Sequence, residues 1–469
     1  MFDDWPPFAL KRVLTILLLV GPLASRAAPL DAGSILQQVE PAAPPAPSST
    51  GPGLKIEPPG GAEAPSSKPF RVKSIRITGN QAIDTATLHA LVAGEEGRRL
   101  TLVQLEGLAA RLTDYYRAHG YPLARAIIPP QTIRDGVVAI EVIEAHYGKV
   151  ELKNRSGAAA SLLSGTLAPL QSDAPIEQKA LERSLLLLSD LPGVSVDATL
   201  KPGERSGTSD LTVETVPGPT LTGDVAVDNY GDQYTGRARL NGSVRFFEPL
   251  HHGDVLTVSA LTTGNELRYG RLNYELTLNG EGTRLGGAWS DLHYKLGDDL
   301  ASLDGHGRAS VGSLWVKHPL LRSRRINLYG RLRYDRLELR DHLDAAGIKT
   351  DRHLDNWTAS LAGDARDGVL TGGITSWAVR WTAGEVRFDD ALAEAADAFS
   401  AKTQGSFSKW NANLTRLQRL SPRDSLYLAL SGQWTNHNLD SSQKMTAGGP
   451  YTVRAYDVAA VSGDSGTQG

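Results

Sequence analysis

The sequence has no cysteine among its 469 residues, which excludes a disulfide scaffold, a thiolate zinc site, an iron–sulfur cluster and a cysteine nucleophile. Only 6% of the residues are aromatic and 41% are hydrophobic, below the ~45–50% of a typical globular domain. With a mean hydropathy of -0.25, the chain is not a polytopic helical membrane protein. Lysine and arginine number 49 against 52 acidic residues, a balance that gives no global indication of a nucleic-acid partner.

Motifs for catalysis and nucleotide binding are also scarce. Neither Gly-x4-Gly-Lys-Ser/Thr nor Gly-x-Gly-x2-Gly, the loops that cradle phosphates, occurs in the sequence. Residues 463–466 spell the Gly-Asp-Ser-Gly tetrad of trypsin-like proteases, but the flanking contexts of that fold are missing. His251 and His252 share a turn and have no third ligand at helical or hairpin spacing. We therefore expect no catalytic residue, no cofactor, no metal ion and no enzymatic activity.

The N-terminus indicates export. Lys11 and Arg12 precede an apolar run over 13–24, and small residues follow at 25–27. The run is shorter than the ~20 residues that cross a bilayer as a helix, so we interpret residues 1–27 as a cleaved signal peptide. The alternative is a buried N-terminal helix.

A short helix and a linker are expected next. Residues 28–40 form a helix that Asp31 caps, with Ile35, Leu36 and Val39 on one side. Residues 41–68 are rich in Pro, Ala, Ser and Gly with almost nothing to bury, so they predict an extended, mobile linker. A helix on a long tether suggests a part that docks and can leave.

Residues 69–145 and 146–216 have the same predicted order of elements, β-α-α-β-β. In the first segment, amphipathic helices over 85–93 and 102–116 lie between a strand over 70–77 and a pair of strands. The second segment repeats that order more loosely. Two successive copies of one pattern are an internal repeat. The alternative is one larger α+β domain.

From residue 217 to 469, apolar and polar residues alternate along most of the sequence. About eleven segments precede residue 436, each with the ~9–11 residues that cross a bilayer as a tilted strand. One face of each is apolar and the other is too rich in arginine to be packed, which favours a transmembrane antiparallel β-barrel over a soluble sandwich. Six arginines are expected to line an aqueous lumen: Arg237, Arg239, Arg245, Arg271, Arg331 and Arg333.

The stretch 440–456 after the eleventh strand is distinctive because it has Arg454 between apolar neighbours at its tip. An arginine is costly to leave unpaired in a confined space, so it should seek a carboxylate in the lumen. We expect Val453, Arg454, Ala455 and Tyr456 to form a loop-tip anchor, with Arg454 fixing its conformation.

The chain resembles the two-partner secretion (type Vb) outer-membrane transporters of the FhaC/ShlB/HecB type, in the Omp85 superfamily. The order signal, N-terminal helix, linker, two repeats, barrel carries the resemblance over nearly the whole chain. Its motifs are 228–236 at the first strand pair, 282–286 and 294–297 in the fourth and fifth strands, 317–320 at the exit of the sixth, and 453–456 at the tip of the sixth loop. Ala455 stands where glycine is usual.

The resemblance implies a mostly β protein with a sixteen-stranded barrel in the outer membrane and two periplasmic POTRA domains. About eleven to twelve strands are present, so we expect a C-terminally incomplete barrel over 217–469. The implied function is recognition of an unfolded secreted partner by the POTRA domains and its export through the pore, with residues 28–40 as a plug. The partner would be a large β-helical protein of the haemagglutinin/haemolysin type, with outer-membrane lipid around the barrel. The alternatives are an Omp85-type barrel-assembly factor and a passive porin.

Overall fold

The computed structural model describes residues 30–39, 54–56 and 67–469. The predicted signal peptide over 1–27 and most of the linker predicted for 41–68 lie outside the described residues. Helix α2 spans Ala32–Val39. Strand β1 spans Leu54–Ile56 and pairs in parallel with β8 of the second repeat. This strand corrects the expectation of a mobile linker for residues 54–56, because β1 pairs with β8 and Leu54 packs against a hydrophobic core.

The first repeat is a small α/β unit whose helix ends follow from local capping. Asp84 accepts from the Thr87 backbone N–H at the start of α3, and Thr101 with Gln104 forms a capping box at the start of α4. The sheet has the order β3-β6-β5, and the strand predicted over 70–77 is divided into β2 and β3. The elements are β2 (Phe70–Arg71), β3 (Ser74–Thr78), α3 (Thr85–Ala90), η2 (Ala93–Glu95), β4 (Arg99–Leu100), α4 (Leu102–Ala118), β5 (Arg125–Ile127) and β6 (Val137–Ile143).

The second repeat has the same connectivity. In each unit the last strand lies between the first strand, to which it is parallel, and the preceding strand, to which it is antiparallel. This shared topology supports two copies of one unit over a single larger α+β domain. The elements are β7 (His146–Asn154), α5 (Ala160–Leu167), α6 (Gln178–Ser189), β8 (Val194–Pro202) and β9 (Thr208–Pro217), and β1 extends the sheet at its β8 edge.

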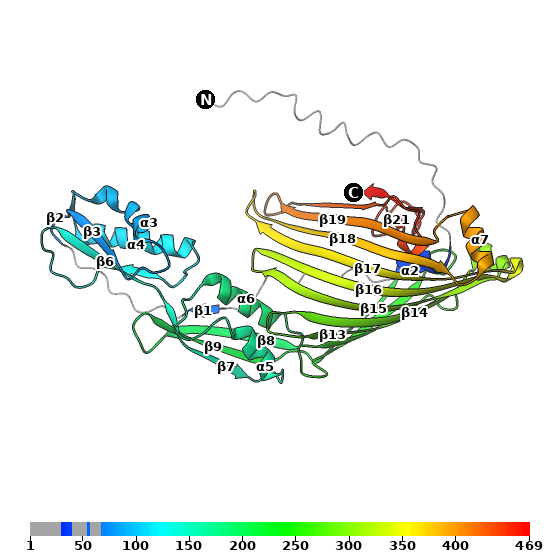
Figure 1. The fold of residues 1–469 in the computed structure, drawn as a ribbon, viewed down its shortest axis with the longest axis horizontal. Helices are drawn as coiled ribbons and strands as arrows, with labels where there is room; N and C mark the ends of the chain where they lie inside the picture. The colour runs from blue at the N-terminus through cyan, green and yellow to red at the C-terminus, as the bar shows by residue number, and fades with distance from the viewer. Residues whose placement is uncertain (1–29, 40–53, 57–66) are drawn as a thin grey trace, which may run out of the picture.

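A twelve-stranded antiparallel sheet follows, and Figure 1 shows it curving away from the two repeats. Eleven of its strands end by Trp434, as the alternation predicted. The strands are β10 (Leu221–Asp228), β11 (Arg239–Phe247), β12 (Val255–Thr262), β13 (Leu267–Thr277), β14 (Arg284–Lys295), β15 (Gly305–Arg322), β16 (Ile326–Leu343), β17 (Ile348–Asp367), β18 (Gly373–Phe388), β19 (Gly405–Arg419), β20 (Ser425–Trp434) and β23 (Gly466–Gln468).

Connections at the end of the sheet farthest from the repeats carry the remaining elements. These are η3 (Asp298–Leu303), η4 (Asp344–Ala346), α7 (Ala391–Phe399), η5 (Ser441–Gln443), β21 (Met445–Ala447) and β22 (Val461–Gly463). The segment 317–320 lies in the sixth strand, β15, as expected. Segments 282–286 and 294–297 both flank or enter β14, the fifth strand, so the assignment of the first of them to the fourth strand was wrong.

The outward face of the sheet is apolar. The strand register aligns one row of side chains across eight strands, from β13 to β20: Leu276, Leu285, Val316, Leu332, Ala359, Trp381, Trp410 and Trp434. Among them, Leu332, Trp381, Trp410 and Trp434 are exposed. Such a band of apolar and aromatic side chains is typical of strands that face lipid. No helix in the described parts of the chain is long and apolar enough to cross a bilayer.

The opposite face, which we call the inward face, is polar along most of its length. One aligned row on it reads Thr222, Arg245, Thr257, Asn273, Ala288, Ser313, Asp335 and Asn356. Ser313 donates to the Asp335 carboxylate at 2.6 Å. Such a polar, hydrogen-bonded face is typical of a polar barrel interior and not of a packed sandwich core.

The strands from β14 to β19 are longer than the ~9–11 residues expected from bilayer thickness. Strand β16 has 18 residues and β17 has 20. Beyond the apolar row, alternate outward positions of β16 are charged or polar: Arg336, Glu338, Arg340 and His342. The extra length is therefore a polar extension of the sheet, at the end that lies away from the repeats.

Candidate functional site

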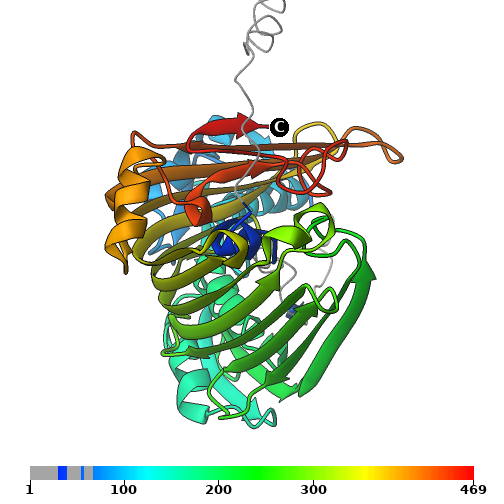
Figure 2. The same cartoon turned by 90° about the vertical axis from the view of Figure 1, so that its right-hand side faces the viewer.

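Helix α2 lies against the inward face of the sheet. Figure 2, which looks onto the end of the sheet away from the repeats, shows α2 in dark blue within the curve of the strands. Ile35 is fully buried, and Leu36 and Val39 are nearly so. They belong to one hydrophobic cluster with inward side chains of the sheet and of the loop after β20: Leu292, Leu337, Leu354, Val386, Phe407 and Leu439. The side of the helix that the sequence indicated as apolar therefore faces the sheet.

A single buried arginine, Arg352 on β17, holds the start of this helix. Its Nε lies 2.5 Å from Asp440, its Nη1 2.7 Å from Asp341, and its Nη2 3.0 Å from Asp31. The same Nη2 donates to the Ser441 hydroxyl at 3.1 Å. Only 3% of the Arg352 side chain is exposed, so these charges interact with little screening by water. We call Arg352, Asp31, Asp341 and Asp440 the Arg352 cluster.

Backbone and side-chain hydrogen bonds extend this attachment along the helix. Asp341 accepts from the backbone N–H of Ala32 at 2.7 Å, and Asp31 caps the helix by accepting from the Ser34 backbone N–H at 2.9 Å. One turn further, the Gln37 amide donates to the carbonyls of Ser441 and Lys444, at 3.1 Å each. The helix is thus fastened to β16, to β17 and to the loop that follows β20.

The cluster contains three carboxylates and one guanidinium, so negative charge is in excess. The pKa values of Asp31 and Asp440 shift in opposite directions. Burial raises the pKa of Asp31 above its ordinary value, although Arg352 acts in the opposite direction. For Asp440 burial also acts upward, but the guanidinium of Arg352 and the Ser442 hydroxyl and backbone N–H hold its pKa below the ordinary value. Asp31, on the helix, is therefore the carboxylate of this pair that most readily takes up a proton.

Five of the six arginines predicted to line the lumen lie on inward positions of strands. Arg239 pairs with Asp228 at 2.7 Å and Arg333 with Asp335 at 2.6 Å, while Arg331 stacks over Trp315. Arg245 and Arg271 occupy inward positions of β11 and β13 in the register described above.

The sixth, Arg237, departs from the expectation that it lies in a strand. Strand β11 begins at Arg239, so Arg237 falls in the connection between β10 and β11 and pairs there with Asp457 at 3.1 Å.

The loop that contains Val453, Arg454, Ala455 and Tyr456 forms a turn, in which the Tyr456 N–H donates to the Val453 carbonyl at 3.1 Å. All four residues are exposed, and within the described part of the chain Arg454 forms no ion pair. Ala455 does not have a positive φ, so alanine in place of glycine carries no left-handed backbone strain here. The anchoring role of this tip stays a prediction.

The same loop touches the other end of the strand order. The Tyr451 ring packs edge-on against the ring of Tyr230 in the connection between β10 and β11, with centroids 5.8 Å apart. Together with the Arg237–Asp457 pair, this contact links the segment after β20 to the beginning of the sheet.

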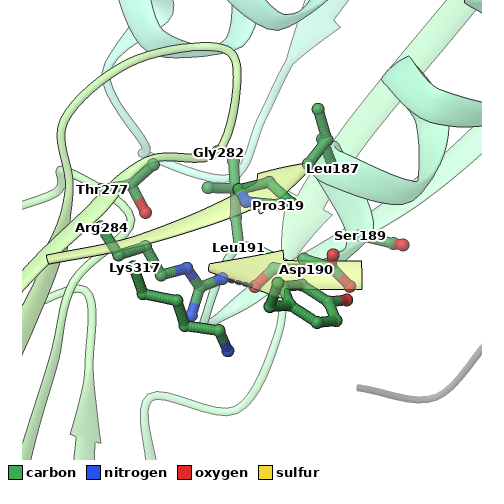
Figure 3. A pocket seen from close by; sticks show the side chains of 10 residues that line it. Leu187, Ser189, Asp190, Leu191, Thr277, Gly282, Arg284, Lys317 and Pro319 are labelled. Carbon is green, nitrogen blue, oxygen red and sulfur yellow. Dashed lines mark hydrogen bonds between the residues drawn. The ribbon is translucent and has the colours of Figure 1, made fainter. Parts of the chain in front are cut away.

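The second repeat is joined to the sheet by a buried ion pair. Asp190, the residue at the end of α6, accepts from Arg322 of β15 at 2.7 Å through both carboxylate oxygens. The Arg322 side chain is fully buried, and its Nη1 also donates to Asn327 at 3.0 Å. A cavity of about 290 Å³ adjoins this pair; Figure 3 shows Arg284 reaching the Asp190 backbone carbonyl across it.

Reasoning from the sequence missed the Arg352 cluster and the Asp190–Arg322 pair. Asp31 and Arg352 are 321 positions apart, and Asp190 and Arg322 are 132 apart. No local spacing connects them. The available signal was a lone inward charge, since an arginine or aspartate on the face that alternation points away from lipid must find a partner.

An antiparallel sheet with an apolar outward face, a polar inward face and two small repeats at one end is the architecture of an outer-membrane protein that crosses the bilayer with β-strands. Residues 207–468 match the family described as haemolysin secretion/activation protein ShlB/FhaC/HecB, and the chain belongs to this family. Residues 70–145 match the POTRA domain of ShlB type. The chain is thus a two-partner secretion transporter of the outer membrane, and its POTRA repeats lie in the periplasm.

Curated relatives agree with this assignment. The chain is similar to the heme/hemopexin transporter protein HuxB of Haemophilus influenzae, with 28% identity over 403 residues, 85% of this chain and 71% of the relative. It is also similar to the outer membrane transporter CdiB of Escherichia coli, with 24% identity over 412 residues, 85% of this chain and 67% of the relative.

Solved structures show the same fold. CdiB from Escherichia coli superposes with a TM-score of 0.67 at 22% identity, covering 88% of this chain and 76% of that chain. CdiB from Acinetobacter baumannii gives a TM-score of 0.59 at 18% identity, covering 86% and 75%.

Proposed function

We propose that the transporter exports one large, β-helical exoprotein, which the POTRA repeats receive unfolded and which then crosses the membrane along the inward face of the sheet. The observation that carries the proposal is the position of α2. The helix fills the space beside the inward face, and the charges that fasten it lie on strands and on a loop, so its departure would clear a polar path without unpairing a strand.

The second repeat supports capture by strand addition. Its β8 edge is already extended by β1, through the register Leu54–Ala198, Lys55–Thr199 and Ile56–Leu200. Only three residue pairs hold β1, and Lys55 and Ile56 are exposed. An extended segment of the cargo could displace β1 and use the same backbone groups, which is β-augmentation.

The apolar row on the outward face indicates what surrounds the sheet. We assign it to the acyl chains of the outer membrane, because lipid-facing positions of membrane strands alternate with lumen positions. The inward arginines, Arg245 and Arg271 among them, then offer a hydrated path for a polypeptide.

The decisive experiment deletes residues 70–216 and follows export of the cognate exoprotein from cells, together with ion conductance in planar bilayers. We expect export to stop while conductance persists, because the capture edges are removed and the strands are not. A passive porin would show conductance and no cargo-specific export even with the repeats present. Continued export after the deletion would overturn the capture role of the repeats.

A further inference from the structure

Three potential metal ligands meet at the end of the sheet farthest from the repeats. His306 is the second residue of β15 and His342 the last but one of β16, and the register makes them direct cross-strand partners. Their rings lie 5.3 Å apart at an interplanar angle of 80°. Asp344 begins η4, two residues after His342. One donor atom from each of the three side chains lies within 4.8 Å of the other two.

Each imidazole has a polar neighbour on the side away from the proposed ion, a hydrogen bond for His306 and a nearby carboxylate for His342. His306 Nδ1 lies 3.2 Å from the backbone carbonyl of Asp304; only an N–H can face a carbonyl oxygen, so Nε2 keeps its lone pair. His342 Nε2 lies 3.6 Å from Asp351 Oδ1, a buried oxygen with no hydrogen-bond partner among the described residues. A carboxylate behind the ring is the usual support of a metal-binding histidine.

Charges of both signs surround the three candidate ligands. Three carboxylates, of Asp304, Asp344 and Asp351, stand near two ammonium groups, of Lys295 and Lys349, which flank the histidine pair in the same cross-strand row. Lys295 is neutralised by Asp304 at 3.0 Å. In the next outward row Arg308 and Arg340 are cross-strand partners, and Arg340 also lies opposite Asp351.

We propose that His306, His342 and Asp344 bind one Zn²⁺ ion on the cell-surface end of the sheet. Two imidazoles and one carboxylate are a common zinc ligand set, which leaves a coordination position for water. Zinc holds such ligands at about 2.0–2.2 Å, so small side-chain rotations complete the site. These positions lie beyond the apolar row, on the polar extension of the sheet, where an aqueous ion can reach them.

The ion would fasten two surface connections to each other. His306 follows the connection that contains η3, and Asp344 lies in the connection that contains η4. The site is separate from the Arg352 cluster, in which Asp341 of β16 and Arg352 of β17 lie on inward positions. It does not depend on the proposed export function.

Zinc titration of the purified chain in detergent, against a competing chromophoric chelator, tests the proposal. The wild type should bind one ion that His306→Ala and His342→Ala each weaken by about tenfold or more. His293→Ala is the matched control, because His293 lies on the same outward face and pairs with Asp291 at 3.0 Å, but has Arg308 as its cross-strand partner. Undiminished binding in the His306→Ala/His342→Ala double variant would overturn the proposal.

A second measurement uses only the wild type and so does not depend on how the variants fold. Hydrogen exchange with and without Zn²⁺ should show slower exchange confined to residues 298–307 and 341–348. If zinc leaves these two connections unchanged, or protects only the turn that contains His251 and His252, the assignment of the site is wrong.

Discussion

Arg352 forms ion pairs with carboxylates from three distant parts of the chain. Asp31 belongs to the helix, Asp341 to β16 and Asp440 to the loop after β20. A buried guanidinium shared in this way does not by itself imply high stability. Its effect is to hold the start of the helix at the sheet, because removal of this one cation would leave three carboxylates close together.

Substitution of this arginine should therefore release the helix. We expect Arg352→Met to destabilise the docked helix by about 3–5 kcal/mol, as for other broken buried pairs, and to raise the open fraction in planar-bilayer recordings. Asp31→Asn should leave the channel closed, because the carboxamide oxygen can still accept from the Ser34 backbone N–H. Burial, which raises the pKa of Asp31, also lowers the cost of losing its charge. Arg336→Met, which removes a half-exposed outward arginine, is the control. Equal conductance in Arg352→Met and wild type would refute the anchoring role.

Glu248, in the turn between β11 and β12, gives a pH-dependent prediction. Burial, with Asp254 nearby, raises the pKa of Glu248 to about 7. The folded chain then keeps a proton that the unfolded chain loses near the ordinary value of 4.5, so this group lowers stability as pH rises from 4.5 through 7.

Glu248→Gln removes that penalty. Its thermal midpoint in detergent should exceed that of the wild type at pH 8, and the difference should shrink at pH 5. Glu281→Gln, in the exposed turn before β14, is the control and should change neither midpoint. An equal gain at both pH values would show that the effect is not the titration of Glu248.

At the scale of elements, Gly33 of helix α2 lowers helix propensity but permits closer packing. Gly33 lowers the intrinsic stability of the helix, and alanine there would add about 1 kcal/mol. A Cβ at Gly33, however, would lie 2.4 Å from the Ser441 hydroxyl and 2.8 Å from the Ser442 backbone nitrogen. The glycine therefore permits close approach of the helix to the loop after β20.

Gly33→Ala should weaken docking despite its higher helix propensity. Bilayer recordings should show more frequent opening than in the wild type. Gly107→Ala in α4, where an added Cβ meets nothing within 4 Å, should leave gating unchanged. A more firmly closed channel in Gly33→Ala would show that propensity outweighs the contact.

The elements differ in how far the sequence determines them. The eleven strands before Trp434 were predictable because apolar and polar positions alternate in each. The length of the strands from β14 to β19 was not predictable. Beyond the apolar row, outward positions such as Arg336 and Arg340 become polar, and the contrast between the two faces is lost. Strand β1 was missed since three residues in a Pro-rich stretch have no periodicity; only pairing with β8 makes them a strand.

The candidate site was predictable only in part, for the same physical reason. The apolar side of α2 follows from the spacing of Ile35, Leu36 and Val39. What that side contacts depends on strands some 300 residues later, whose Leu354 and Val386 belong to the same hydrophobic cluster as the helix. Contacts between distant segments leave no pattern in one sequence.

At the scale of the whole molecule, the Asp190–Arg322 pair couples the periplasmic repeats to the sheet. Arg322 is fully buried and donates to both carboxylate oxygens of Asp190. Asp190→Ala removes this buried ion pair, and we expect the joint to lose about 3–5 kcal/mol. Faster hydrogen exchange in α6 and reduced export should follow. Glu204→Ala is the control, because the ion pair of Glu204 with Lys149 is exposed and such pairs contribute about 0–1 kcal/mol. Identical exchange in Asp190→Ala and wild type would contradict the coupling.

We propose that cargo passes through the space that α2 fills. Because the native chain has no cysteine, Gln37→Cys and Lys444→Cys introduce one thiol pair, at positions already joined by a 3.1 Å side-chain-to-carbonyl hydrogen bond. A short bis-maleimide added to cells that express this double variant would hold the helix in place. We predict that crosslinking abolishes secretion of the cognate exoprotein, while each single-cysteine variant treated in the same way secretes normally. Secretion that continues at the wild-type rate with the helix crosslinked would contradict the account.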